Sequence, residues 1–266
     1  MQASVYNLEG KEASKVALPL QFEEPFRIDL VRRALLSEQS AVRQPQAHSL
    51  MAGLNTTAVY VGAYGTYRTG RHMGIAIRPR QKLAGGAMGD VRRIPSATKG
   101  KRAHPHKIEK KIREEINIKE YRKAISSAIG GTASAEELKG RIPALKLSVP
   151  IVVEDGIEKI AKTKELVKTL KNLGLDSVLE DAKEPKIKTG HARYASRRSY
   201  KKNLLIVVGS PSKVESSGRN IAGVDVCKVD DLRVKLLAPG AMPRVVVWSA
   251  SAISRLGDAI SKIRPM

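Results

Sequence analysis

The segment from Arg43 to Lys107 lacks the residues needed to build a hydrophobic core, and this constrains the fold more than any other feature. Its only acidic residue is Asp90. Bulky apolar residues are sparse and keep neither a helical nor a strand period. Such a stretch buries too little apolar area to offset its ordering entropy, and it far exceeds the roughly 12–15 residues of an ordinary structureless loop. We expect it to be disordered alone and ordered by a partner.

RNA suits this segment as the partner. Its glycines allow the backbone to approach phosphates closely, and arginine side chains match phosphate oxygens in a two-pronged geometry. The chain has 48 Lys and Arg against 26 Asp and Glu, and its net charge of +22 favours nucleic acid over a merely solvated basic surface. The candidate RNA-binding residues here are Arg43, Arg68, Arg71, Arg78, Arg80, Lys82, Arg92, Arg93, Lys99, Lys101, Arg102, His104 and Lys107.

A second basic stretch lies between Pro185 and Asn203 and contains no acidic residue. Tyr194 and Tyr200 are interleaved with its cations, where they can stack on bases. The alternative interpretation is a solvated surface loop, but the absence of counter-charge favours a phosphate contact. Its candidate RNA-binding residues are Lys186, Lys188, Arg193, Arg197, Arg198 and Lys201.

Outside these stretches the chain predicts a folded α/β body. Short apolar runs alternate with segments of helical periodicity, which favours a three-layer α/β/α fold with a mainly parallel sheet of about four strands. We expect one globular domain over residues 1–266, with 43–107 as an inserted extended loop and 185–203 as a second basic surface loop. The expected strands are Ser148–Val153, Asn203–Val208, Val224–Cys227 and Val245–Trp248, with a hairpin opening at Ser4–Leu8 and a further candidate at Leu175–Leu179.

Four helices are expected. The second is capped by Asn117 in an N-x-x-E pattern and ends at Gly130-Gly131. The third covers Glu158–Leu173 and the fourth Ala252–Ile263. The first follows Pro25, with Arg32, Arg33 and Glu38 off its inner face, which consists of Ile28, Val31, Leu35 and Leu36.

No pattern of a catalytic site is present, so we expect no catalytic residues and no cofactor. The stretch Gly65–His72 lacks the Lys and Ser/Thr of a phosphate-binding P-loop. Gly62–Gly65 matches the short GXXG loop of KH domains without the flanking helices. Gly209–Ser212 follows a strand and can hold a phosphate, although a plain turn is the preferred interpretation. His104-Pro105-His106 lacks a nearby carboxylate or cysteine, so no metal site is expected.

Cysteine content and hydropathy set further bounds. The single Cys227 excludes an internal disulfide framework and a cysteine-based zinc site, and we interpret it as a small buried hydrophobe. The longest apolar runs fall far below the roughly 18 residues of a membrane span. With no signal-peptide pattern at the N-terminus, the expectation is an intracellular protein with no membrane partner.

Several segments occur in an order that is distinctive when they are taken together. They are VYNLEG at Val5–Gly10, LVRRALLSEQSAVRQPQ at Leu30–Gln46, RTGR at Arg68–Arg71, GG at Gly85-Gly86, KGKRAHPHKIEK at Lys99–Lys110, INIKEYRKAISSAI at Ile116–Ile129, VPIVVED at Val149–Asp155, NIAGVDV at Asn220–Val226 and LAPG at Leu237–Gly240. In these segments and their order the chain resembles one known family, the archaeal-type members of the fourth-protein (L-four) family of the large ribosomal subunit. The resemblance covers nearly the whole chain.

This resemblance implies a structural, non-enzymatic role in the cytoplasmic ribosome. The family's α/β/α body packs on large-subunit ribosomal RNA, and its long loop reaches the polypeptide exit tunnel. By motif position, the loop tip is Gly65–Met73 and the segment Lys99–His106 contacts RNA at the loop base. The implied partners are large-subunit ribosomal RNA and neighbouring ribosomal proteins, without an obligate homo-oligomer. The candidates for lining the tunnel are Arg68, Thr69, Gly70, Arg71 and His72.

Two other functions stay open from sequence. An RNA-directed enzyme, such as a methyltransferase, would use a Gly-rich cofactor loop after the first strong strand. Here that strand is followed by Glu154-Asp155-Gly156, which is unsuited to phosphate. A translational regulator that binds its own messenger RNA is the other alternative.

Overall fold

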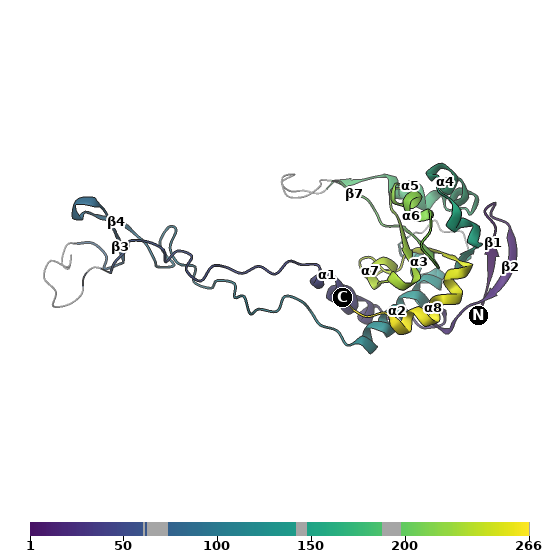
Figure 1. Ribbon diagram of the computed structural model, residues 1–266, viewed down its shortest axis with the longest axis horizontal. Helices are drawn as coiled ribbons and strands as arrows, with labels where there is room; N and C mark the ends of the chain where they lie inside the picture. The colour runs from purple at the N-terminus through teal and green to yellow at the C-terminus, as the bar shows by residue number, and fades with distance from the viewer. Residues whose placement is uncertain (61, 63–73, 142–147, 188–197, 266) are drawn as a thin grey trace. The chain divides into compact units, whose positions relative to one another are not determined.

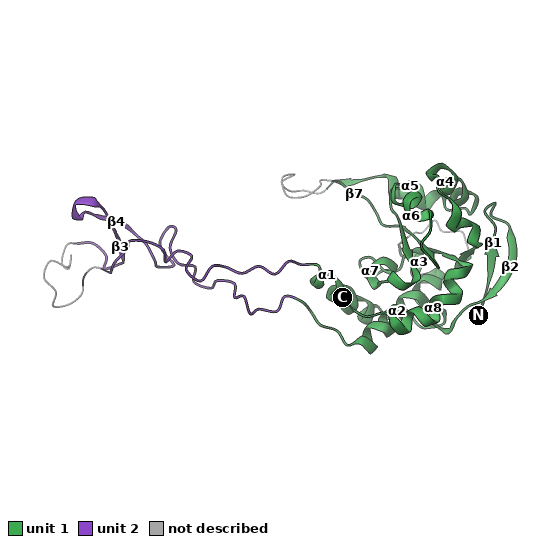
Figure 2. Ribbon diagram, viewed as in Figure 1, with its two compact units in different colours: residues 1–42, 113–266 green, residues 43–112 purple. Residues whose placement is uncertain are grey.

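The computed structural model describes residues 1–60, 62, 74–141, 148–187 and 198–265. The chain divides into two compact units, coloured separately in Figure 2. Unit 1 comprises Met1–Val42 and Arg113–Met266, and unit 2 comprises Arg43–Ile112.

Unit 1 is built on a six-stranded sheet with the order β2-β1-β5-β10-β8-β9 (Figure 1). All neighbouring strands pair in parallel except β2, which pairs antiparallel with β1. The mainly parallel sheet predicted from sequence is therefore confirmed. Its strands are β1 (Gln2–Tyr6), β2 (Glu12–Ala17), β5 (Ile151–Val153), β8 (Leu204–Val208), β9 (Val224–Lys228) and β10 (Val245–Ser249).

The expectation of about four strands is wrong for this sheet. The opening hairpin, β1 and β2, joins it because Ala3 and Val5 of β1 are buried and β1 pairs with β5. The candidate strand at Leu175–Leu179 is also wrong, because these residues enter helix α5 (Asp176–Lys183). Val178, Leu179 and Ala182 are buried at helical spacing, a pattern too short to distinguish from a strand by sequence.

Alternate residues of the strands belong to two separate hydrophobic clusters. Val152, Leu205 and Trp248 belong to one cluster, together with buried residues of α1, α2 and α8. Ile151, Ile206 and other strand residues belong to the second, together with residues of α4, α5 and α6. Because successive side chains of a strand point to opposite faces, helices cover both faces of the sheet.

The described helices are α1 (Ile28–Ala41), α2 (Ile118–Ala133), α3 (Ala135–Lys139), α4 (Thr163–Asn172), α5, α6 (Val214–Arg219), α7 (Val234–Leu237) and α8 (Ala250–Lys262). Short 3-10 turns lie at η1 (Leu20–Phe22), η2 (Ala84–Gly86), η3 (Asp155–Lys159) and η4 (Val229–Asp231). Helices α2 and α8 contact each other (Figure 1). The C-terminal helix is confirmed within two residues.

The predicted cap of α2 is confirmed, and its predicted end is wrong. The Asn117 side chain accepts a hydrogen bond from the Lys119 amide at 3.0 Å. The helix continues through Gly130 and Gly131 to Ala133. Both glycines are buried: a Cβ on Gly130 would lie 1.9 Å from the Glu24 carbonyl oxygen. They serve close packing inside the helix.

Two other helix predictions need correction. On α1, Val31 and Leu35 are buried as predicted, but Ile28 is 42% exposed and Leu36 46% exposed. The buried face instead includes Ala34 and Glu38. The helix expected at Glu158–Leu173 is split, because η3 ends at Lys159 and α4 begins at Thr163.

Unit 2 contains a small antiparallel ribbon of β3 (Arg80–Lys82) and β4 (Met88–Val91), joined through η2. In the second basic stretch of unit 1, β6 (Lys186–Ile187) pairs antiparallel with β7 (Arg198–Ser199). The strand propensity of such short polar segments is weak, so the sequence patterns did not predict either ribbon.

Candidate nucleic-acid interface

Several predicted RNA-binding residues lie outside the described residues. They are Arg68, Thr69, Gly70, Arg71 and His72 at the expected loop tip, and Lys188, Arg193 and Arg197 in the second basic stretch. The remaining candidates are described, and their surroundings define the candidate interface.

Unit 2 is organised mainly by its own backbone. The amides and carbonyls of Val59 and Arg80 exchange two hydrogen bonds of 3.0 Å, which adds a bridge beside the β3–β4 ribbon. The His48 amide donates to the His106 carbonyl oxygen at 3.1 Å. The bond between His48 and His106 connects residues from the two ends of unit 2, and neither hydrophobic cluster includes any described residue of this unit.

A close backbone approach requires glycine within unit 2. Gly53 has a φ of +78°, and a Cβ built there would lie 2.3 Å from the Gly100 carbonyl oxygen. No other residue type combines this left-handed conformation with that proximity at low cost. Gly53 therefore fixes the crossing of the two segments of unit 2.

Some predicted phosphate ligands bind the protein itself. Arg92 donates to the Thr98 carbonyl oxygen at 2.6 Å and pairs with Asp90 at 3.2 Å, and its side chain is only 15% exposed. Arg93 donates to the Ala58 carbonyl oxygen at 3.3 Å, and Arg80 to that of Ala76 at 3.3 Å. The contacts of Arg92 are thus chiefly intramolecular, and they connect Asp90 to Thr98 within unit 2.

A second group of cations is exposed, and their side chains have no hydrogen-bond or ion-pair partner within the part of the chain that the structure describes. These side chains present charge to solvent without competition from internal acids, which is the arrangement that phosphate binding needs. The group consists of Arg43, Lys82, Lys99, Lys101, Arg102 and Lys107. His104 is also exposed, whereas Arg78 donates to the neighbouring Ile77 carbonyl oxygen at 3.2 Å.

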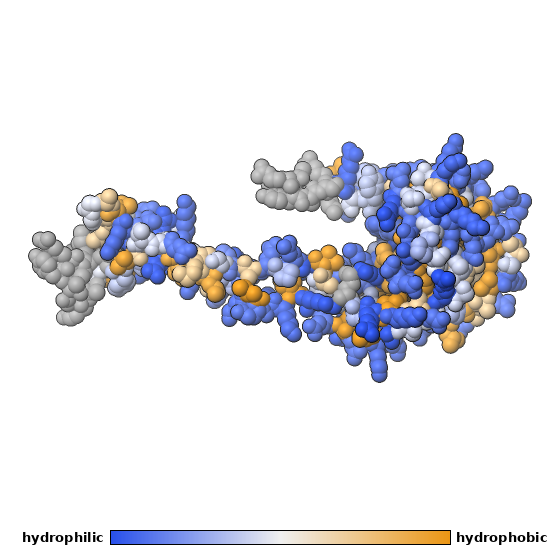
Figure 3. All heavy atoms as spheres, viewed as in Figure 1, coloured by the Kyte–Doolittle hydropathy of each residue, from blue (hydrophilic) through white to orange (hydrophobic). Residues whose placement is uncertain are grey.

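Sequence reasoning missed the exposed apolar side chains of unit 2. Leu50 is 75% exposed, Ile108 74% and Tyr60 60%. Figure 3 shows apolar side chains on the surface of this unit among hydrophilic ones. These exposed apolar side chains are further candidates for contact with a partner. The sequence signal that could have identified them is the presence of large apolar residues that follow neither a helical nor a strand periodicity.

Not every basic side chain of the second basic stretch is without an acidic partner. Lys201 forms an ion pair with Asp181, an acid that precedes the stretch on α5. Lys186 is exposed and Tyr200 is 45% exposed, so these two side chains remain available to a ligand. The missing counter-charge of Lys201 is supplied by tertiary structure, which local sequence cannot reveal.

Protein groups fill the position where many α/β sheets bind phosphate, at the carboxyl ends of the parallel strands. The Glu158 Oε1 atom accepts hydrogen bonds from the Gly209 amide at 2.9 Å, Ser249 Oγ at 2.8 Å and Ser251 Oγ at 2.7 Å. Ser210 Oγ donates to its Oε2 at 3.4 Å. Burial acts to raise the pKa of Glu158, but these hydrogen bonds outweigh it, and its pKa lies below the ordinary value.

This carboxylate decides the interpretation of Gly209 and Ser210. An anionic side chain already occupies the amide that a phosphate would need, so the turn is a structural one. The arrangement also removes the support for a nucleotide-binding enzyme on this body. Among the described residues, no group of three or more His, Cys, Asp or Glu side chains is placed to hold a metal ion.

The described helices include none that combines the length and apolar character needed to cross a membrane. The buried Cys227 lies on β9 as a free thiol, as predicted, and burial raises its pKa to about 12.

Comparison with known families agrees with this geometry. The model of the ribosomal protein L4/L1 family matches residues 16–259, most of the chain. The chain belongs to this family. The L4/L1 assignment bears out the resemblance drawn from the segments between Val5 and Gly240, which also covers nearly the full length.

Individual L4/L1 relatives align over almost their whole length. Proteins named large ribosomal subunit protein uL4 are 38% identical over 261 residues in Archaeoglobus fulgidus, 37% over 261 in Methanococcus aeolicus and 38% over 264 in Methanocaldococcus jannaschii. The alignments cover 96–97% of this chain and 98–99% of those relatives.

Proposed function

We propose that this member of the L4/L1 family is a non-enzymatic structural constituent of the large ribosomal subunit in the cytoplasm. It binds large-subunit ribosomal RNA and packs beside neighbouring ribosomal proteins, with no obligate homo-oligomer. The observation that carries this proposal is the group of exposed, unpaired cations Arg43, Lys82, Lys99, Lys101, Arg102 and Lys107 in the described part of unit 2. The family assignment supports the same role.

In this proposal the body is a three-layer α/β/α domain, and residues 43–107 form an inserted extended loop that orders on RNA. Two hydrophobic clusters that share the strands of one sheet support the layered body. The loop neutralises phosphates inside the folded RNA, where A-form helices are recognised by shape, phosphate and 2′-hydroxyl groups. Residues 68–72 line the exit tunnel, and residues 185–203 form a second RNA contact.

The proposal is tested first by sedimentation. Extract is fractionated on sucrose gradients before and after a high-salt wash, and each fraction is probed for this protein. Co-sedimentation with the large subunit through the wash is expected, with unit 2 protected from protease only in that fraction. A protein that remains at the top of the gradient contradicts the ribosomal role.

A binding series assigns the RNA contact to unit 2. Replacing Lys99, Lys101 and Arg102 by Ala is expected to reduce the salt dependence of binding to large-subunit RNA by about two counterions, at roughly 0.7–0.9 per phosphate contact. The matched control replaces Lys159, Lys164 and Lys168, which are exposed cations of unit 1, by Ala. Equal losses in both variants would mean that only net charge matters.

Regulation through its own messenger RNA remains a separate hypothesis. Competition between that transcript and large-subunit RNA for the purified protein tests it directly.

A further inference from the structure

Strand β9 is an edge of the six-stranded sheet, and its outer backbone is unpaired in the described part of the chain. The amides of Asn203 and Leu204 both donate to the Gly223 carbonyl oxygen at 3.1 Å. In a parallel pair, alternate residues direct their backbone groups to the same neighbour. Asp225 and Cys227 therefore face β8 with their backbone groups, whereas Val226 and Lys228 direct theirs outward.

The opposite edge of the sheet has an irregular pairing that β9 lacks, and the two charged residues of β9, Asp225 and Lys228, are both engaged in ion pairs. Strand β2 carries exposed charged residues at Glu12 and Lys15, and the β1–β2 pairing is irregular between Val5 and Tyr6. Charges and bulges of this kind prevent another chain from pairing with an edge. Strand β9 instead places an apolar, partly exposed residue, Val226, at the centre of its free edge.

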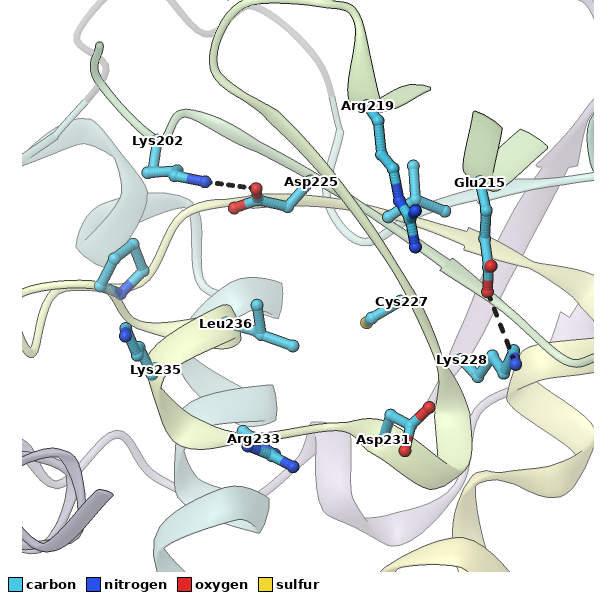
Figure 4. Close-up of a pocket in the computed structure, with 12 residues that line it drawn as sticks. Lys202, Glu215, Arg219, Asp225, Cys227, Lys228, Asp231, Arg233, Lys235 and Leu236 are labelled. Atoms are coloured by element: carbon cyan, nitrogen blue, oxygen red, sulfur yellow. Dashed lines mark hydrogen bonds and ion pairs between the residues drawn. The ribbon is translucent and has the colours of Figure 1, made fainter. Parts of the chain in front are cut away.

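A groove follows this free edge. One hollow of about 680 Å³ and a second of about 830 Å³ share Lys202, Arg219, Asp225, Val226 and Leu236 in their linings, so they form a continuous depression along β9. In Figure 4 the side chains of Cys227 and Leu236 point toward one another across the first hollow. This gives the groove a small apolar floor beside an unpaired strand.

Positive charge lies on both sides of the groove. Arg219 ends helix α6 on one side, and Lys235 belongs to α7 on the other (Figure 4). Neither has an ion-pair partner among the described residues. The groove's acids Asp225 and Glu215 are already paired, with Lys202 at 2.5 Å and with Lys228 at 3.7 Å. Asp231 also lines the hollow, where five cations outnumber three acids.

We infer that this groove binds an extended, acidic segment of another protein, which adds to the sheet as a further strand beside β9. Its backbone hydrogen-bonds to the outward groups of Val226 and Lys228, as in other cases of strand addition. Its side chains alternate between the α6 side, where an acid meets Arg219, and the α7 side, where an acid meets Lys235. The inference concerns a protein partner and does not depend on RNA binding by unit 2.

The test uses the full-length protein and a capped peptide of about eight residues in which Val-Val and Glu-Glu pairs alternate. This pattern places Glu side chains on both faces of the strand, and the length suits a typical strand. Hydrogen exchange followed by mass spectrometry is expected to show protection of the segment containing Val226 on peptide addition. Replacing Arg219 and Lys235 together by Glu is expected to weaken peptide binding by at least about tenfold through charge repulsion. The control replaces Lys164 and Lys168 by Glu, which changes net charge equally on α4.

Two further ligands separate strand pairing from charge attraction. A peptide with alternate backbone amides N-methylated keeps the charge but loses the hydrogen bonds, and it is expected to give no protection. A peptide with Lys in place of Glu is also expected not to bind. Equal binding of either peptide overturns the proposal.

Three other outcomes would overturn the proposal of an acidic strand in the groove. If peptide at about 1 mM, the weak end of specific recognition, leaves β9 unprotected, the groove does not accept a strand. Protection of the same amides by a uridine oligonucleotide that displaces the peptide identifies a phosphate site instead. Protection that rises with protein concentration alone identifies a second copy of this chain. RNA binding by the Arg219 and Lys235 variant is measured in parallel, so that failure of the groove is distinguished from failure of the ribosomal role.

Discussion

Glu38 is a buried charge that joins three helices. Its carboxylate, 2% exposed, accepts hydrogen bonds from Tyr121 Oη of α2 at 2.5 Å and from the Val234 and Lys235 amides of α7 at 2.9 Å each. These amides lie at the start of α7, where a negative charge also interacts favourably with the helix dipole. The pKa of Tyr121 is raised above its usual value, first by burial and then by the Glu38 charge.

Replacing Glu38 by Ala is expected to lower the free energy of unfolding by about 3 kcal/mol, because two buried donors and one partly buried donor lose their acceptor. Glu38→Gln retains an acceptor oxygen and should cost less, about 1–2 kcal/mol. Urea denaturation at neutral pH measures both. The control Glu180→Ala, at an exposed position of α5, should stay within about 0.5 kcal/mol of the parent. A loss at Glu180 equal to that at Glu38 would contradict the bridging role.

The α1 pattern did not predict the burial of Glu38. Helical spacing assigned Ile28 and Leu36 to the inner face and left Glu38 off it. The partner amides of α7 are 196 and 197 residues away along the chain, and local periodicity carries no information about them. Buried charges with distant partners are thus the part of the core that a single sequence predicts least well.

Cys227 gives a pH-dependent prediction at the same scale. Burial raises the pKa of its thiol to about 12, so the folded state keeps the neutral thiol while the unfolded chain ionises near pH 8.5. This contribution to stability is complete below about pH 8.5 and is lost as the pH rises toward 12. We expect the stability difference between the parent and Cys227→Val to shift by about 1 kcal/mol per pH unit in that window. A pH-independent difference would show that the thiol is not protected.

At the scale of elements, the interior glycines of α2 illustrate how packing overrides helix propensity. The glycine pair predicted a helix end because glycine commonly follows the last turn. In the structure α2 passes η1 and the segment around Glu24 and Phe26 so closely that a side chain is excluded. The strand propensity at Leu175–Leu179 failed for a related reason, since a short apolar run fits either element until its neighbours are known.

Replacing Gly131 by Ala is therefore expected to destabilise unit 1. A Cβ at this position would lie 2.5 Å from the Phe26 ring, and the resulting displacement should cost about 1–3 kcal/mol despite the better helix propensity of Ala. The matched control is Gly257→Ala in α8, an exposed position where a Cβ meets nothing within 4 Å. It should stabilise the protein by up to about 1 kcal/mol. Thermal unfolding that shifts in the same direction for both variants would contradict this account.

For the whole molecule, composition bears on how the chain divides, and the inserted loop stays a prediction. The change from alternating apolar runs to a basic, glycine-rich stretch predicted a loop at 43–107, and the structure separates a unit at Arg43–Ile112. The β3–β4 ribbon and the internal contacts of Arg92 were not predictable, because they depend on backbone geometry that residue types alone do not specify. Both hydrophobic clusters consist of unit 1 residues.

Unit 1 is therefore expected to fold without unit 2. The two points where unit 2 is inserted into unit 1 lie close together, because the Glu114 amide donates to Ser40 Oγ at 2.8 Å and its carbonyl oxygen accepts from Ser37 Oγ at 2.7 Å. A Gly/Ser linker of about eight residues in place of residues 44–111 makes the connection about eightfold shorter. The smaller entropy cost of closing this loop should stabilise the body by up to about 2 kcal/mol. Urea denaturation and RNA titration measure the two consequences. A folded variant with nearly all of its RNA affinity lost is expected, whereas retained affinity would move the main RNA contact to unit 1 and an unfolded variant would make unit 2 part of the folding core.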